Sequence, residues 1–150
     1  MVATQVPARS LIVQVRAADG TTWLPIKGIT QWTMNPAEGE EVTDTTTYDS
    51  QGDAESRKMQ RGKSIKGEGK LYKDSVTGAQ DPGQARCEVI ADSLAEDSVG
   101  RVRFRHPMDT QWKVWDAIFS VGEQGGGNND MTSWSVTATR TGSSMTASAP

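Results

Sequence analysis

The sequence predicts a mainly β protein, a barrel or sandwich that is covered on one side by a single helix. Short segments that alternate apolar and polar residues recur along the 150 residues, which is typical of half-buried strands. Only one segment carries a helix-start signal followed by apolar residues at helical spacing. The apolar fraction is 35% and there are 15 glycines, which indicates long polar connections. A chain of this length is expected to form one domain.

The first strands follow a polar N-terminal arm, residues 1–10. Alternation in Leu11–Ala18 predicts a strand, and Asp19-Gly20 is a strong hairpin signal. Thr21–Met34 is therefore expected to return as the antiparallel partner. Pro25 cannot donate to a strand ladder, which favours an edge position or a bulge there.

The segment 36–62 lacks apolar periodicity and separates its charges by sign. From Glu38 to Glu55 there are seven acidic residues and no basic one, whereas Arg57 to Lys73 holds seven basic residues and one acidic residue. Structureless loops longer than about 12–15 residues are uncommon in compact domains and are usually functional or disordered. We therefore interpret the rest of the chain as a rigid scaffold that presents this loop, which we expect to be mobile until it contacts a partner.

The two charged runs can pair in two ways, and the sequence leaves both open. The acidic run of one subunit can meet the basic run of a neighbour, or both runs can face each other within one hairpin. Calcium binding by the acids Glu38, Glu40, Glu41 and Asp44 is the weaker interpretation, since the loop lacks the order of ligands found in calcium-binding loops.

The middle of the chain predicts one strand and the helix. In Ser64–Lys73, Gly67 and Gly69 share a face with apolar residues, which indicates that another backbone or a large side chain approaches closely there. Asp81 suits an N-cap, Pro82 suits the first helical position, and Gln84 completes a capping-box-like pattern. The predicted helix covers 82–94, with an apolar stripe of Val89, Ile90, Ser93 and Leu94.

The last third is predicted to return to strands. In Arg101–His106 we expect Val102 and Phe104 to face inward and the three arginines outward. Gln111–Val121 is apolar on both faces and is placed centrally. Met131–Arg140 alternates again, which ends the predicted domain, residues 11–140. The tail, residues 141–150, is rich in small residues and is expected to be flexible.

The residues offer little for catalysis. His106 is the single histidine and Cys87 the single cysteine, so the usual zinc sites are excluded. A nucleophilic Cys87–His106 pair is less plausible than a buried thiol and a turn histidine. Gly125–Gly127 is not followed by the residues of a phosphate-binding loop. Net charge is -3, which argues against a nucleic-acid-binding domain. We therefore expect no enzyme activity and no cofactor.

Five tryptophans raise the possibility of a carbohydrate-binding surface. Trp32, Trp112 and Trp134 lie in apolar alternation, so core packing is the better interpretation. The arginine face of residues 101–105 could contact phosphate, but such a face is more often solvated or half of a protein interface. What remains is assembly, because the loop, the arm and the tail have little to bury alone.

The segment Trp23–Trp32, the acidic run Glu38–Glu55 and the following glycine-bounded basic strand resemble the major tail tube protein of long-tailed double-stranded DNA bacteriophages. The resemblance extends from about Leu11 to Arg140. It implies a β-sandwich of two antiparallel sheets with one flanking helix, a fold shared with contractile-tail and type VI secretion tubes. The family-like motif consists of Trp23, Ile26, Gly28, Thr30, Trp32, Asp44, Asp49, Ser50 and Gly52.

The resemblance also implies an assembly. Six subunits would form a ring, and rings would stack into a hollow tube through which viral DNA passes without specific binding. The loop 36–62 would contact the adjacent ring and the helix would correspond to 82–94, while no lumen-lining residue is assigned. The inter-ring residues would be Glu38, Glu40, Glu41, Asp44, Asp49, Asp53, Arg57, Lys58 and Arg61.

Implied partners are further copies of the chain, a tape measure protein, a tail terminator and baseplate proteins, with no membrane. The expected location is the tail of the virion, after assembly in the host cytoplasm. Two alternatives stay open: a tail terminator or neck component on the same fold, and a monomeric β-sandwich module that binds glycans.

Overall fold

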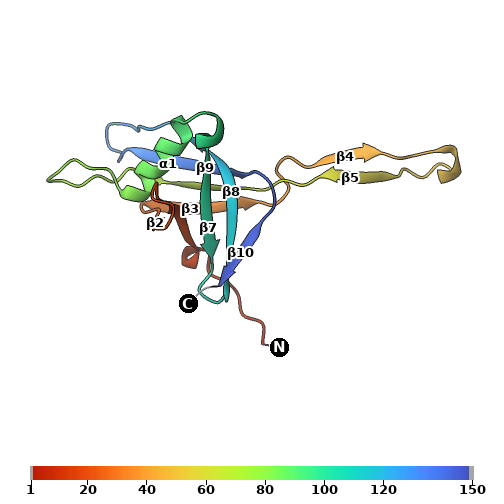
Figure 1. The fold of residues 1–150 in the computed structure, drawn as a ribbon, viewed down its shortest axis with the longest axis horizontal. Helices are drawn as coiled ribbons and strands as arrows, with labels where there is room; N and C mark the ends of the chain where they lie inside the picture. Colours follow the sequence, from red (N-terminus) through yellow and green to blue (C-terminus); the bar gives the residue numbers. More distant parts are fainter. Residues whose placement is uncertain (1, 149–150) are drawn as a thin grey trace.

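The computed structural model describes residues 2–148, and its centre is one antiparallel sheet of eight strands (Figure 1). Seven strands follow the order β2-β1-β7-β8-β9-β6-β3, β10 also pairs with β8, and β4 and β5 form a second sheet. The strands are β1 Ile12–Arg16, β2 Trp23–Pro25, β3 Ile29–Asn35, β4 Glu41–Asp44, β5 Ser56–Gln60, β6 Ser64–Lys70, β7 Val99–Arg105, β8 Gln111–Val121, β9 Ser133–Arg140 and β10 Met145–Ser148. The helices are α1 Pro82–Asp92 and the 3-10 turns η1 Ala8–Ser10, η2 Tyr48–Ser50 and η3 Ala95–Ser98. The predicted mainly β fold with two antiparallel sheets and a helix is confirmed, although the large sheet is not a closed barrel.

The large sheet folds over itself at β8. One edge of β8 pairs with β10 from Gln111 to Val114 and then with β9 from Ala117 to Val121. The N–H of Thr141 donates to the carbonyl of Asp116 between these two stretches. In Figure 1, β7, β8 and β10 cross β3 and β9 steeply, so the two halves of the sheet enclose a common interior.

The core lies between these halves and beneath α1. Its most completely buried large side chains include Trp115, Trp134 and Ile65. Phe104 meets Trp115 edge to face, with ring centroids 4.8 Å apart. The predicted inward positions Val102 and Phe104 are buried, and β8 is central as expected.

Two glycines of β6 accept close neighbours from β3, as the sequence indicated. Trp32 lies directly across from Gly67, where an added Cβ would stand 2.5 Å from its indole ring. A Cβ at Gly69 would collide with the carbonyl oxygen of Gly28. Without side chains at these positions, β3 and its tryptophan can lie flat against β6.

Helix α1 begins as predicted, because the carboxylate of Asp81 accepts the N–H of Gln84. The side chain of Gln84 does not complete the capping box. It is fully buried, accepts the N–H of Tyr72 at 3.2 Å and donates to the carbonyls of Lys27 and Lys70 at 2.8 and 2.9 Å. One amide therefore ties the start of the helix to the β2–β3 link and to the end of β6.

The predicted apolar stripe of the helix is wrong except at Ile90, which is buried. Val89 is 56% exposed and Leu94 is 84% exposed, and the helix ends at Asp92. The helix contacts the sheet with a different side from the one predicted, because the buried side includes the polar residue Gln84. The buried helical residues are Gly83, Gln84, Cys87 and Ile90. Burial raises the pKa of the Cys87 thiol, so this cysteine behaves as a small apolar side chain.

Two further segments differ from the prediction. Thr21–Met34 is not one strand, because only β2 pairs with β1, while β3 crosses to pair with β6. Part of the expected flexible tail is ordered as β10, although residues 149–150, like Met1 of the arm, lie outside the described residues. Alternation alone does not reveal the partner of a strand, and β10 is only four residues long with every residue exposed, so it carries no clear pattern of burial.

Trp112 is buried on the outer face of the sheet and not in the core. The guanidinium of Arg103 lies between the indoles of Trp23 and Trp112, 4.4 and 4.2 Å from their ring centroids. Its Nε also donates to Oε1 of Gln14 at 2.8 Å. Burial, with a smaller effect of Arg105, lowers the pKa of Arg103. The arginines face outward as predicted, and Arg103 covers a tryptophan there by cation–π contact.

Candidate assembly surface

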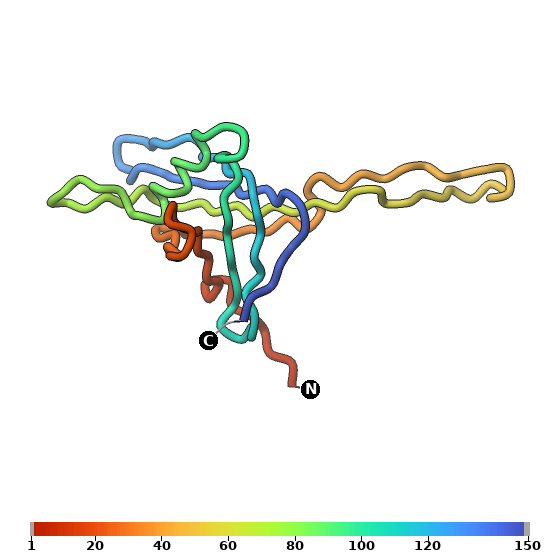
Figure 2. Tube along the Cα trace, in the orientation of Figure 1, coloured from red at the N-terminus to blue at the C-terminus, as the bar shows by residue number. Residues whose placement is uncertain are grey.

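The charge-divided segment forms an antiparallel hairpin that projects from the body (Figure 2). Strand β4 pairs with β5 from Val42 opposite Lys58 to Asp44 opposite Ser56, with an irregularity next to Glu41. Where the hairpin leaves the body, the carbonyl oxygen of Glu38 lies against Gly62, so a Cβ at that position would clash. Part of the expected structureless loop is therefore strand. The start of the acidic run, up to Asp44, lies opposite the start of the basic run, Arg57 and Lys58, within one chain.

The tip of the hairpin is held by its own hydrogen bonds. The N–H of Thr45 donates to the carbonyl of Glu55, and the hydroxyl of Thr46 accepts the N–H of Glu55. The turn η2 is closed by a reciprocal capping box between Thr47 and Ser50. The tip therefore has a definite shape without any contact to the body.

The hairpin has no interior. Val42, Met59 and Tyr48 are 60%, 69% and 103% exposed, and every residue of both strands is exposed. A two-stranded hairpin alone is marginally stable in water. Its polar backbone and its few apolar side chains are therefore available to a partner.

The nine predicted interface residues all lie on this hairpin or at its base, and one ion pair joins them in the described part of the chain. Lys58 Nζ is 3.0 Å from Glu40 Oε1, a half-exposed contact that contributes about 0.2–1 kcal/mol. Glu38 accepts a hydrogen bond from Asn35. Hydrogen bonds from Thr46 lower the pKa of Asp44. Glu41, Asp49, Asp53, Arg57 and Arg61 are exposed.

A cleft at the base of the hairpin brings together three cationic side chains, two that are neighbours in the sequence and one that is distant. It has a volume of about 530 Å³ and is lined by Arg61, Lys63 and Arg140, together with Met59 and the residues 142–144. The N–H of Arg140 donates to the carbonyl of Lys63, which places the two side chains at one end of the β6–β9 pair. Lys63 and Arg140 were not among the predicted site residues. Lys63 is two residues from Arg61 in the sequence, whereas only strand pairing brings Arg140 to them.

The motif residues have local structural roles. Trp23 stacks on Arg103, Ile26 is in the core, and Trp32 packs on Gly67. Thr30 donates to the carbonyl of Glu68, and Ser50 closes η2. Gly28 and Gly52 have positive φ angles of 82° and 89°. Much of the motif therefore supports folding, whereas Asp49 is exposed on the tip.

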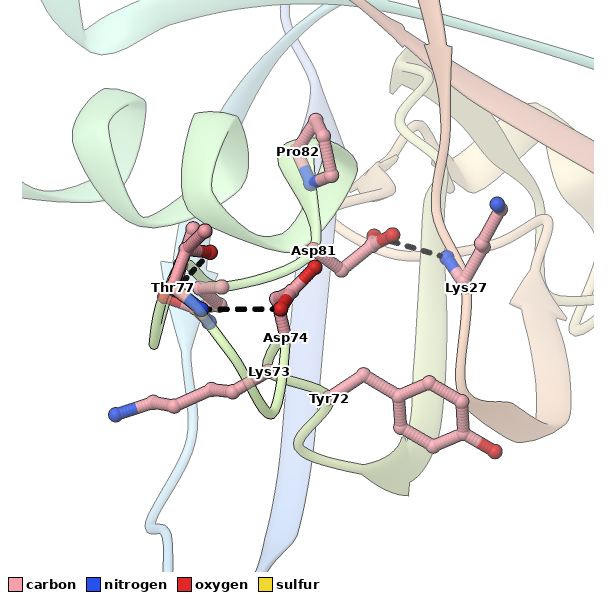
Figure 3. A pocket seen from close by; sticks show the side chains of 9 residues that line it. Lys27, Tyr72, Lys73, Asp74, Thr77, Asp81 and Pro82 are labelled. Carbon is pink, nitrogen blue, oxygen red and sulfur yellow. Dashed lines mark hydrogen bonds between the residues drawn. The ribbon is translucent and has the colours of Figure 1, made fainter.

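A second cleft lies at the opposite end of the molecule, beside the β6–α1 connector, and has a volume of about 390 Å³ (Figure 3). Its two carboxylates already have structural partners. Asp74 accepts the N–H groups of Thr77 and Val76, which lower its pKa, and Asp81 accepts from Lys27 and Gln84. The cleft presents Lys27 and Lys73 without a free carboxylate to act as a base.

Among residues 2–148 there is no group of three or more His, Cys, Asp or Glu side chains arranged to hold a metal ion. His106 lies at the end of β7, and Cys87 is buried in α1. No helix within the described range is long and apolar enough to span a membrane.

No protein-family model matches the sequence, and no curated protein matches it. Solved structures do match the fold. A chain in the tail of an empty gene transfer agent particle, refined with C6 symmetry, is 18% identical with a TM-score of 0.72, covering 95% of this chain and 98% of that chain. A chain in the virion of the native gene transfer agent is 19% identical with a TM-score of 0.67 and the same coverage.

A chain in the six-fold symmetrised baseplate of an anti-feeding prophage is 12% identical with a TM-score of 0.59, covering 99% of this chain and 98% of that chain. The likeness extends over nearly the whole of each chain. The protein therefore has a fold found in tail and baseplate chains, which agrees with the expected phage tail-tube-like fold.

Proposed function

We propose that this protein is a structural subunit of a phage-type tail tube, in which hexameric rings stack into a hollow tube. The observation that carries the proposal is the match of fold over 95% of the chain to a tail refined with C6 symmetry. The projecting hairpin supports it, because an exposed hairpin without an interior gains stability from a neighbouring subunit.

In the proposed tube the hairpin 36–62 contacts the adjacent ring, and the arm and tail add contacts between subunits. Viral DNA passes through the lumen without specific binding, and the tube joins tape measure, terminator and baseplate proteins. The subunit assembles in the host cytoplasm and ends in the tail of the particle. It acts by shape and charge and catalyses no reaction.

A second candidate is another tail component of the same fold, such as a terminator or neck protein that stops at one ring. The likeness to a baseplate chain favours it, since the fold is found there too. The glycan-binding module has less support, because Trp112, Trp115 and Trp134 are buried and Trp23 and Trp32 are partly covered.

Negative-stain electron microscopy of the purified protein over a range of concentrations tests these functions. A tube subunit forms rings that extend into hollow filaments as concentration rises. A terminator or neck protein stops at rings. Particles that stay monomeric at every concentration and salt would overturn the proposal.

A further inference from the structure

The tip of the hairpin carries acidic side chains and no basic one. Asp49, Asp53 and Glu55 follow Asp44, and the chain has no lysine or arginine from Thr45 to Ser56. All four acids are exposed. In the described part of the chain, the carboxylates of Asp49, Asp53 and Glu55 have no ion pair or hydrogen bond. The tip is therefore a shaped, negatively charged projection.

The cleft at the base of the hairpin has the opposite charge. Arg61, Lys63 and Arg140 line it, and no carboxylate does. Arg140 Nη1 donates to Ser144, while its Nε is buried and has no partner among the described residues. Three cations in one cleft repel one another, so an anionic group placed there is favourable.

A tip cannot reach the cleft of its own chain. Glu55 and Arg61 stand at opposite ends of β5, and six residues of strand span about 20 Å. Figure 1 shows the hairpin extended away from the body. A contact between these opposite charges would therefore join two molecules. It would be heterologous, and such a contact can continue around a ring or along a tube.

We infer that the acidic tip of one subunit docks in the basic cleft at the base of a neighbouring subunit's hairpin. The inference rests on the proposed function and names the two surfaces that meet. Arg61, Lys63 and Arg140 face Asp49, Asp53 and Glu55 across the contact. Lys58 is not part of it, because it already pairs with Glu40 in its own chain.

The cleft at the other end of the molecule is a weaker receptor for the tip. Lys27 and Lys73 line it, but Asp74 and Asp81 line it too. Their negative charges offset the two lysines, whereas the cleft at the hairpin base has three cations and no acid. This second cleft therefore provides a control.

Charge reversal on each side tests the contact. The tip variant carries Asp49→Lys, Asp53→Lys and Glu55→Lys, and the cleft variant carries Arg61→Glu and Lys63→Glu, while Arg140 is kept because it bonds Ser144. Each variant is expected to melt like the wild type. Each is expected to raise the concentration needed for assembly, measured by sedimentation velocity and negative stain, roughly tenfold or more, because several pairs per contact are reversed.

The two variants should assemble when mixed, because each tip then finds a cleft of opposite sign. A chain carrying all five changes should also assemble with itself. The control variant Lys27→Glu with Lys73→Glu should assemble like the wild type. Assembly of the wild type should weaken at 1 M salt, where the Debye length falls from about 8 Å to about 3 Å.

The outcomes separate this inference from the proposed function. If the wild type forms tubes and both reversal variants form them equally well, the docking is wrong and the tube stands. If the control variant fails to assemble alone but assembles when mixed with the tip variant, the tip docks in the cleft beside the β6–α1 connector. If duplex DNA binds the wild type, not the cleft variant, and mixing restores nothing, the cleft is a phosphate site.

Discussion

Trp134 in β9 and Tyr48 at the tip of the hairpin are the most buried and the most exposed of the large aromatic residues. Trp134 has no exposed surface and donates from Nε1 to Glu88, whereas Tyr48 is 103% exposed. Both are large aromatic residues, one within a strand and the other in the turn between two strands. The large sheet gains its stability by enclosing an interior, while the β4–β5 hairpin has only its own hydrogen bonds. The first region has an interior of its own, and the second has none.

Hydrogen exchange should give the largest difference between the two regions. In the monomer, amides of β8 and β9 open only with global unfolding, whose free energy is about 5–15 kcal/mol for a typical domain. Amides of β4 and β5 need only local opening and should exchange roughly a thousandfold faster or more. Equal protection of both in the monomer would show that the hairpin needs no partner. Protection of β4 and β5 that appears only on assembly would sharpen the comparison.

Truncation of the two aromatic residues should give the next largest difference. Trp134→Ala removes a fully buried indole and should lower the free energy of unfolding by about 3–5 kcal/mol. The matched variant Tyr48→Ala should change it by less than about 0.5 kcal/mol, because its side chain is exposed. Urea denaturation of the monomer measures both. A large loss in the tyrosine variant would mean that the hairpin folds together with the body.

Two glutamines allow the same comparison for polar contacts. Gln84→Ala leaves two carbonyls and one N–H without their partner and should cost about 2–4 kcal/mol. Gln60→Ala removes one exposed bond to the carbonyl of Gly39 and should cost less than about 1 kcal/mol. Thermal denaturation of the two variants measures which of them loses more stability. Equal losses would contradict the role of Gln84 as the tie between helix and sheet.

The smallest effect concerns two aspartates that accept N–H groups in turns. Bonds from Thr22 and Thr21 lower the pKa of Asp19 from 3.8 to about 2. Because the pKa of Asp19 is lower in the folded state than in the unfolded state, its ionised carboxylate stabilises the fold. This stabilisation is fully present above pH 3.8 and is lost as the pH falls through about 2. Asp19→Asn should therefore flatten the dependence of stability on pH between these values. Asp44→Asn, in the hairpin, should leave the acid melt unchanged, and a change there would couple the hairpin to the body.

Local patterns predicted the parts of the fold whose cause is local. Period-two alternation located the buried Val102 and Phe104, and the capping chemistry of Asp81 located the start of the helix. The hairpin of the charged segment was one of two alternatives that the sequence left open. Both faces of its strands are exposed, so no alternation was present to decide between them. The buried side of α1 was not predicted correctly, because it contains a polar residue, Gln84. Pairing between distant strands, which joins Lys63 to Arg140, leaves no signal in a single sequence.

The pairing of β1 with β7 joins Ile12–Val15 to Val102–Arg105, two segments that are far apart in the sequence. Such non-local pairing is slow, on the order of milliseconds to seconds, whereas a hairpin closes in about 1–10 μs. We expect β4 and β5 to pair and separate many times before the large sheet has folded. During that interval their exposed surface is charged and contains little apolar area, which keeps nascent chains apart. We therefore expect the same charges to reduce aggregation of the subunit before it has folded.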